Sequence, residues 1–187
     1  MKMNVYVYLI RLPNALRRRY QRALLKSAFK ENLELGHLVR LASPEKIQIH
    51  SKGKLEIGNG SIIEEDSLLN ISGHCKIGDN CYVSTRVLIG CSLKVTIGDQ
   101  VAIGPNVIVL DSNHNFDNLE MPIVLQGASL ESVHIQSNCW IGANSIILPG
   151  VDLANHVVVA AGSVVTKSFG PNVLIAGNPA RVIRSID

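Results

Sequence analysis

The sequence predicts an all-β parallel β-helix, a coil whose short strands form the flat sides of a prism. Two observations point to it. An aliphatic–glycine pair recurs at intervals related to six residues, and the composition is 47% hydrophobic but only 4% aromatic. Many short strands that pack aliphatic side chains have such a composition. A chain of 187 residues is long enough to bury one core of this kind without disulfides.

The repeat is visible as aliphatic residues followed by glycine. The pairs are Ile57-Gly58, Ile77-Gly78, Ile89-Gly90, Ile97-Gly98, Ile103-Gly104 and Ile141-Gly142. Their intervals are 20, 12, 8, 6 and 38 residues, each a multiple of six or such a multiple plus two. A period of six fits a three-sided coil in which about 18 residues advance the chain by one strand spacing of roughly 4.8 Å. The two-residue surpluses near 69–71 and 90–96 predict bulged corners.

The charge is distributed unevenly along the chain. Residues 1–30 hold eight Lys and Arg and no acidic residue, whereas the remainder holds ten basic and fifteen acidic residues. Residues 1–45 also lack the repeat, and leucines there recur every three or four residues, which predicts one or two amphipathic helices. We therefore expect a basic helical segment at 1–45 and a β-helix domain at 46–187 with a loop insertion at 111–132.

Two interpretations of the basic segment stay open. It can cap the open end of the β-helix, as repeat proteins require. Alternatively, residues 11–30 make a peripheral contact with an anionic membrane surface. Nucleic-acid binding is not expected, because aromatic residues are not interleaved with the basic ones and the rest of the chain is acidic.

The cysteines indicate a reducing compartment. Cys75, Cys81, Cys91 and Cys139 form no CxxC pair and no metal-ligand spacing, so we expect buried thiols and no metal requirement. The apolar run Val5 to Ile10 is too short to span a bilayer. We expect a cytoplasmic protein, with peripheral attachment at the inner membrane face as the alternative.

Four segments near the C-terminus carry a family resemblance. They are Cys-Trp-Ile-Gly-Ala-Asn (139–144), Pro-Gly-Val (149–151), Ala-Gly-Ser-Val-Val-Thr-Lys (161–167) and Ala-Gly-Asn-Pro-Ala-Arg-Val-Ile-Arg (176–184). With them, residues 57–186 resemble the hexapeptide-repeat acyltransferases, especially the maltose, galactoside and nodulation-type O-acetyltransferases and the xenobiotic acetyltransferases. The resemblance implies a left-handed coil, acetyl-CoA as the acetyl donor, and a homotrimer with active sites between subunits.

The loop insertion contains the predicted catalytic residue. His114 lies in the polar run Asp111-Ser112-Asn113-His114-Asn115 and matches the histidine of the family's catalytic segment. A neutral imidazole, with an unperturbed pKa of ~6.5, can accept the proton of an attacking hydroxyl near neutral pH. Asp111, Asp117 or a backbone carbonyl remain open as the group that orients its ring. We expect the other five histidines to be solvated or structural.

The same matching implies the remaining site residues except Arg86, which lies where this chain departs from the sugar enzymes. Trp140, Asn113 and Arg86 are expected at the acceptor. The residues expected at acetyl-CoA are Gly142, Ala143, Ala161, Thr166, Lys167, Arg181 and Arg184. Where the sugar enzymes carry Asn and Asp ligands, this chain reads Val83-Ser84-Thr85-Arg86. Their usual sugar is therefore not the expected acceptor, and Arg86 either meets an acidic group or forms an exposed ion pair.

These observations predict an acetyltransferase that acts on a hydroxyl of a small saccharide or a surface-polysaccharide unit, by direct transfer in a ternary complex. The alternatives are an N-acetyltransferase for an amino sugar and an acetyltransferase for an antibiotic-like alcohol. A zinc carbonic anhydrase of the same fold requires paired histidines, and none lies near His114. A binding scaffold without catalysis is a further alternative, which the His114 and Trp140 segments argue against.

Overall fold

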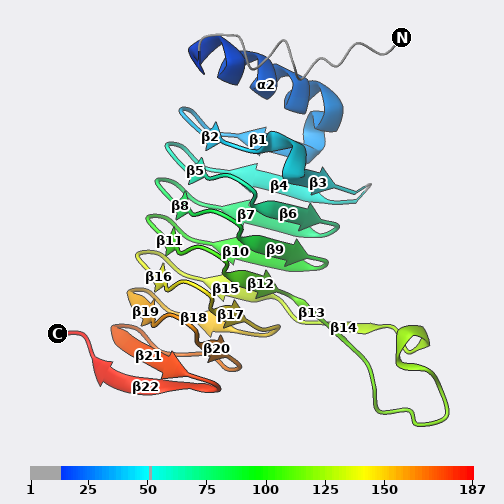
Figure 1. Cartoon of the computed structure of the whole chain (residues 1–187), viewed down its shortest axis with the longest axis vertical. Helices are drawn as coiled ribbons and strands as arrows, with labels where there is room; N and C mark the ends of the chain where they lie inside the picture. The colour runs from blue at the N-terminus through cyan, green and yellow to red at the C-terminus, as the bar shows by residue number, and fades with distance from the viewer. Residues whose placement is uncertain (1–13, 51) are drawn as a thin grey trace.

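The computed structural model describes residues 14–50 and 52–187. Over these residues the chain winds into a three-sided parallel β-helix with one helix at its N-terminal end and one projecting hairpin (Figure 1). The predicted all-β class is therefore confirmed, together with the parallel β-helix, the helical N-terminal segment and the protruding loop. The coil is left-handed, as the family resemblance implies.

Each side of the prism is one sheet. Sheet A contains β1 (Leu33–Leu35), β4 (Lys54–Ile57), β7 (His74–Ile77), β10 (Lys94–Ile97), β15 (Val133–Ile135) and β18 (Asp152–Leu153). Sheet B contains β2 (Arg40–Leu41), β5 (Ile62–Ile63), β8 (Tyr82–Val83), β11 (Ala102–Ile103), β16 (Trp140–Ile141), β19 (Val157–Val159), β21 (Val173–Gly177) and β22 (Ala180–Ser185). Sheet C contains β3 (Ile47–Ile49), β6 (Leu68–Ile71), β9 (Leu88–Cys91), β12 (Ile108–Leu110), β17 (Ile146–Ile147) and β20 (Val164–Val165).

The coils differ in length along the chain. Lys54 and Lys94 both pair with His74, so the coils there are 20 residues long, whereas His134 pairs with Asp152 only 18 residues later. The extra two residues lie at 72–73 and 92–93, where the chain turns from sheet C into sheet A. They adjoin or fall within the segments where bulged corners are predicted. The 38-residue step from Val95 to Val133 holds the hairpin.

The aliphatic residues that begin each repeat, here called the leads, form the core. Ile57, Ile77, Ile97 and Ile135 stack in sheet A and are at most 2% exposed. Buried serines of the repeat form hydrogen bonds with the backbone. The Ser61 hydroxyl, for example, donates to the Gly78 carbonyl at 2.7 Å and accepts from the Cys81 amide at 2.9 Å. All four cysteines are buried free thiols, as predicted.

Helix α2 (Asn14–Phe29) covers the N-terminal end of the coil (Figure 1). Leu25 joins the core, and the Arg22 guanidinium donates to the Leu35 carbonyl at 2.7 Å. These contacts fit the cap interpretation. Two short 3-10 helices follow, η1 (Lys30–Asn32) and η2 (Pro44–Lys46). Among the described residues no helix is long and apolar enough to cross a membrane.

The β-helix begins earlier than the expected boundary at residue 46. β1 pairs in register with β4, so the first coil starts at Leu33. Its lead is Leu35-Gly36, which has the aliphatic–glycine form with leucine in place of isoleucine. Of the segment expected to contact a membrane, residues 11–13 lie outside the described part of the chain.

Candidate active site

His114 is the last residue of β13 (Ser112–His114), which pairs with β14 (Ala128–Leu130) in an antiparallel hairpin. The hairpin leaves the corner between sheets C and A and extends away from the prism (Figure 1). Both His114 and its neighbour Asn113 are exposed. The hairpin therefore presents an exposed imidazole near its root, three residues after the buried Asp111.

Asp111 fixes the base of this hairpin. It is fully buried, and its carboxylate accepts hydrogen bonds from the backbone amides of Ser92, Leu93 and Lys94, each at 2.8 Å. Its carbonyl accepts from the Glu131 amide at 2.9 Å, which closes the hairpin. Asp111 thus binds the extra-residue corner of the preceding coil and not the His114 ring. Of the carboxylates considered for orienting that ring, the exposed Asp117 remains.

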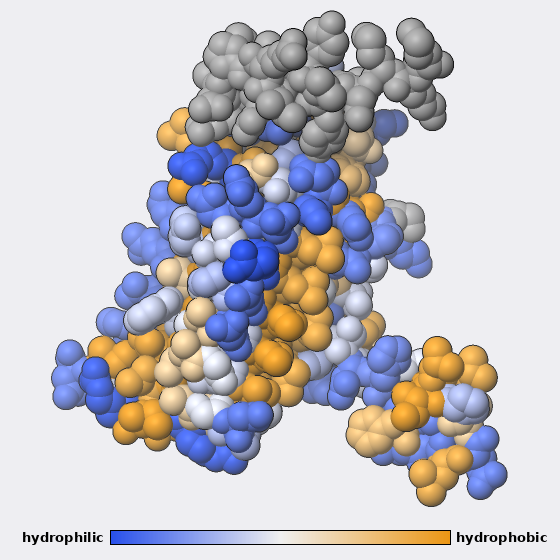
Figure 2. Space-filling model, in the orientation of Figure 1, coloured by the Kyte–Doolittle hydropathy of each residue, from blue (hydrophilic) through white to orange (hydrophobic). Residues whose placement is uncertain are grey.

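The tip of the hairpin is ordered by Gln126. Its side chain accepts from the Asn118 amide at 3.0 Å and donates to the carbonyls of Asn118 and Met121 at 2.8 and 2.7 Å. A short 3-10 helix, η3 (Ile123–Leu125), precedes it. The tip is nevertheless apolar on its surface (Figure 2), with exposed Phe116, Leu119, Met121, Ile123, Val124 and Leu125. Sequence reasoning missed these residues, although six apolar side chains in a loop were the available signal.

A second group of predicted residues lies on the other side of sheet C. Trp140 begins β16 on the outer face of sheet B and is 57% exposed. Ala143 and Ala161 occupy successive rungs of the corner between sheets B and C, where the Gly162 amide donates to the Ala143 carbonyl at 2.8 Å. Arg86 lies in the same corner nearer the N-terminus, where its Nε donates to Asn106 at 2.8 Å.

Gly142 has a structural reason to be glycine. A Cβ at this position would lie 2.5 Å from the Ala161 nitrogen and 2.7 Å from the Val159 carbonyl oxygen. Both atoms belong to the backbone of the next coil, so the close stacking of coils requires the absent side chain. This contact accounts for Gly142 whether or not its backbone also meets acetyl-CoA.

The remaining predicted residues lie near the C-terminal end. Thr166 and Lys167 are exposed just after β20, on the sheet C-to-A side, and the Lys167 ammonium lies 5.7 Å from the centroid of the Phe169 ring. Arg181 and Arg184 are exposed on β22, which pairs antiparallel with β21. Their guanidinium groups donate to the carbonyls of Ala180 and Ser185, at 2.8 and 2.9 Å.

The predicted site residues thus form two groups separated by sheet C. Asn113, His114, Thr166 and Lys167 lie on the side of sheet A, whereas the others lie on the side of sheet B. Between them runs a ladder of outward-facing, half-buried aliphatic residues, here called the sheet C ladder: Leu68, Leu88, Ile108, Ile146 and Val164. Figure 2 shows apolar surface on the side of the body where β6, β9 and β12 lie. One protomer does not bring the two groups together.

The comparisons with known proteins agree with this fold. Residues 132–167 match a family model described as bacterial transferase hexapeptide (six repeats). Nodulation protein L of Rhizobium meliloti is 38% identical over 131 residues, which are 70% of this chain and 70% of that protein. The chain belongs to the hexapeptide-repeat acyltransferase family. The predicted resemblance is confirmed.

Other members of the hexapeptide-repeat acyltransferases are similar over comparable lengths. Galactoside O-acetyltransferase of Escherichia coli K12 is 34% identical over 139 residues, or 70% of this chain, and the chain spans 64% of that relative. A putative lipopolysaccharide biosynthesis O-acetyl transferase of the same organism, WbbJ, is 35% identical over 113 residues, which are 57% of this chain and 58% of that protein.

Two solved acyltransferase structures have the same fold. A galactoside acetyltransferase in complex with coenzyme A superposes with a TM-score of 0.64 at 26% identity, covering 97% of this chain and 76% of that one. A mutant of AntD, an N-acyltransferase from Bacillus cereus, in complex with dTDP and coenzyme A, gives 0.74 at 25% identity, covering 89% of each chain.

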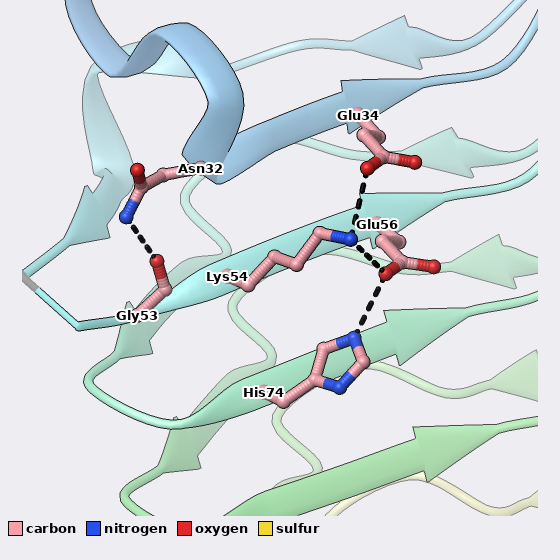
Figure 3. A network of polar contacts seen from close by, with 6 residues as sticks. All are labelled: Asn32, Glu34, Gly53, Lys54, Glu56 and His74. Carbon is pink, nitrogen blue, oxygen red and sulfur yellow. Dashed lines mark hydrogen bonds and ion pairs between the residues drawn. The ribbon is translucent and has the colours of Figure 1, made fainter.

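Sheet A differs from the apolar sheet C because its outer face is charged. The Lys54 ammonium lies 2.9 Å from Glu34 and 2.8 Å from Glu56, and His74 Nε2 lies 2.9 Å from Glu56 (Figure 3). The hydrogen bonds that Lys54 donates to Glu34 and Glu56 raise the pKa of Lys54. The hydrogen bonds that Glu56 accepts from Lys54 and, to a smaller extent, from His74 hold the pKa of Glu56 below its ordinary value. Among the described residues no group of three or more His, Cys, Asp and Glu is arranged to hold a metal.

Proposed function

We propose that this protein transfers an acetyl group from acetyl-CoA to a hydroxyl of a sugar or a surface-polysaccharide unit, with His114 as the general base. Family membership supports the reaction class. The single observation that carries the assignment of His114 is its position, exposed at the end of β13 on an ordered hairpin that projects from its own protomer. The names of the galactoside and WbbJ relatives support a saccharide acceptor.

The active site forms between protomers of a homotrimer in this proposal. The sheet C ladder is apolar and faces outward, so a closed ring of three copies that turns sheet C inward buries it on every protomer. The sheet C-to-A side of one protomer then faces the sheet B side of the next. His114 and Lys167 of one copy thereby join Trp140, Ala161 and Arg86 of another, which one protomer alone keeps apart.

The apolar hairpin tip gives independent support to this assembly. Leu119 is 94% exposed and Val124 is 77% exposed in a single protomer. Monomeric proteins rarely display a cluster of this kind on an ordered projection. In the proposed trimer the tip packs on the neighbouring protomer and holds His114 over the shared cleft.

The residues divide the chemistry between them. His114 accepts the hydroxyl proton as the acceptor oxygen bonds to the acetyl carbon; the carbon–sulfur bond then breaks, and the proton leaves with the thiol of coenzyme A. Holding both substrates together lowers the barrier without a covalent enzyme intermediate. Ala143 and Ala161 leave room for the pantetheine arm, and Arg181 and Arg184 offer guanidinium groups for its phosphates.

An amino acceptor is the second candidate. The AntD structure, an N-acyltransferase, superposes over 89% of this chain, and the same base serves an amine as well as a hydroxyl. An antibiotic-like alcohol is a further candidate acceptor. A panel that contains neutral sugars, amino sugars and such alcohols separates these candidates by turnover.

The location of the protein is also proposed. We place it in the cytoplasm, where acetyl-CoA is made, with α2 able to rest on the inner membrane face. Helix α2 has five basic residues and no acidic residue in its sequence, and Tyr20 and Leu24 are 46% and 43% exposed. Flotation with anionic and with neutral vesicles tests this contact. The protein is expected to float with the anionic vesicles and not with the neutral ones.

The experiment for the reaction is acetyl-CoA turnover with mixed sugars and glycans by the full chain. His114→Ala is expected to lower kcat by roughly 10²-fold or more, the usual range for loss of a general base. The matched control is His156→Asn, because His156 is exposed at the corner between sheets A and B, which is not the corner that bears the hairpin, and asparagine suits its φ of +60°. Turnover that survives in His114→Ala contradicts the assigned base.

A further inference from the structure

Arg86 occupies a backbone conformation that its neighbours in the stack reserve for other residue types. In the corner between sheets B and C, the residue with positive φ is Asp66, Arg86, Asn106, Asn144 and Gly162 on successive coils. Asp, Asn and Gly tolerate the left-handed region, whereas a long side chain does not favour it. Arg86 has φ of +55° there. Stacking favours asparagine at this position, although Gln100 and His156 adopt the same conformation in the corner between sheets A and B. What distinguishes Arg86 is therefore the charge that it brings to this corner.

The contacts of Arg86 direct its guanidinium toward the coil that bears the hairpin. Its Nε donates to Asn106 Oδ1 at 2.8 Å, and Asn106 in turn donates to Asn144 at 3.0 Å. Glu65 and Asp66 lie on the adjacent rung, and the Glu65 carbonyl accepts from the Arg86 amide at 3.0 Å. Within the described residues, however, no ion pair joins the Arg86 guanidinium to a carboxylate. The exposed-ion-pair alternative therefore gains no support.

The rung of Arg86 is next to the rung that ends in the catalytic hairpin. Leu88 of the following strand pairs directly with Ile108 of β12, and β12 leads into β13 and His114. One rung corresponds to roughly 4.8 Å along the prism. In the proposed trimer, Arg86 of one protomer faces the cleft into which the neighbouring hairpin brings His114. The two groups are then about one rung apart along the axis of the prism.

We infer that the acceptor carries an oxyanion, the carboxylate of an acidic sugar or the phosphate of a phosphorylated sugar, and that Arg86 binds it beside the hydroxyl that receives acetyl. This inference rests on the proposed function. The bond to Asn106 engages Nε and restrains the guanidinium, and the two terminal nitrogens remain as a fork of donors for an anion. Such a fork suits both oxyanions by two parallel hydrogen bonds.

The test compares matched acceptors with and without the anion. Glucose, galactose and mannose are each supplied in three forms: the methyl glycoside, the methyl glycoside of the corresponding uronic acid with its carboxylate free (the uronide), and the 1-phosphate. For each form kcat/KM is measured at saturating acetyl-CoA. The wild-type protein is expected to prefer at least one anionic form over the methyl glycoside of the same sugar by about tenfold or more, the effect of one good charged pair. Preference for the uronide or for the phosphate identifies which anion is recognised.

Arg86→Asn is the decisive variant. Asparagine fills the same position at Asn106 and Asn144, so folding is preserved, and the melting temperature is expected to stay the same or rise by ~2 °C. The ratio of anionic to neutral kcat/KM is expected to fall about tenfold. Arg86→Lys, which keeps the charge and loses the fork, should lie between the two.

Several outcomes overturn the inference while leaving the reaction intact. They are transfer to neutral sugars with no preference for either anion, an unchanged ratio in Arg86→Asn, and a rise in the KM for acetyl-CoA in place of the acceptor effect. A lower melting temperature with equal loss on neutral and anionic acceptors assigns Arg86 to the fold and also overturns it. Absence of transfer to every acceptor in the panel, amino sugars included, contradicts the proposed function itself and removes the basis of the inference.

Discussion

The Asp111 carboxylate accepts a hydrogen bond from the Leu93 amide at 2.8 Å, which joins the root of the hairpin to the corner of the preceding coil. Leu93 is one of the two extra residues that make that coil longer than 18 residues. The two-residue extension of this corner and the hairpin are therefore coupled. The longer corner supplies the backbone donors, and the carboxylate that accepts them sets the direction in which β13 leaves the prism.

Asp111→Asn should destabilise the protein and displace His114. An amide places a donor against backbone donors, and hydrogen bonds to a charged acceptor contribute ~1.5–3 kcal/mol, so the free energy of unfolding should fall by about 2–3 kcal/mol. Denaturant unfolding measures this loss, and kcat should fall with it. The control is Asp117→Asn, an exposed position where a change within about 0.5 kcal/mol is expected. Equal stability of the two variants would show that the buried carboxylate has no such role.

Leu88→Glu should break the trimer. Leu88 lies in the sheet C ladder, and a charge there must be desolvated without a partner when three copies close. Light scattering coupled to gel filtration should report a monomer without acetyl transfer. Thr96→Glu, on the outer face of sheet A in the same coil, should remain a trimer. The interface assignment is wrong if Leu88→Glu keeps the trimeric mass.

Gly142→Ala should lower stability because the added methyl group meets the backbone of the next coil at 2.5 and 2.7 Å. Overpacking of this kind costs ~1–3 kcal/mol. Thermal unfolding measures it. Gly170→Ala is the matched control, since a Cβ there meets nothing within 4 Å. A Gly142→Ala protein of normal stability but with a raised KM for acetyl-CoA would move the role of Gly142 from the fold to the ligand.

The thiols should be unreactive in the folded protein. A hydrogen bond with Cys91, followed by burial, raises the pKa of Cys75, and burial raises the pKa values of Cys81 and Cys139. A raised pKa lowers the fraction of thiolate, the species that attacks an alkylating reagent, so labelling by iodoacetamide at about pH 8 should be slow. Mass spectrometry should find all four cysteines modified only after unfolding. Rapid labelling of the native protein would contradict their burial.

The sequence predicted the fold because the repeat is a local pattern with a direct structural meaning. An aliphatic lead such as Ile77 points inward on every coil, so its period gives the number of sides and the register. The prediction failed to place the start of the β-helix at Leu33, where leucine replaces isoleucine and a helix precedes the first coil. Only the pairing of β1 with β4 reveals that Leu35-Gly36 is part of the stack.

The candidate site was predicted less completely, for a physical reason. A residue such as His114 stands out because it breaks the repeat, whereas the role of Asp111 depends on amides 17 to 19 residues earlier in the chain. Sequence reasoning considered Asp111 only as a partner of His114. The apolar hairpin tip was missed because its side chains could be recognised as an exposed cluster only once the structure placed them outside the core.

Mixing two inactive variants tests the shared site most directly. His114→Ala removes the base from one side of the cleft, and Ala161→Trp fills the acetyl-CoA space on the other, at an exposed position that tolerates the larger side chain. Random trimers of the two variants should contain about a quarter of clefts with both sides intact, so acetyl transfer should return to roughly a quarter of the wild-type rate. If native mass spectrometry finds mixed trimers and the mixture stays as inactive as each variant alone, the site does not lie between protomers.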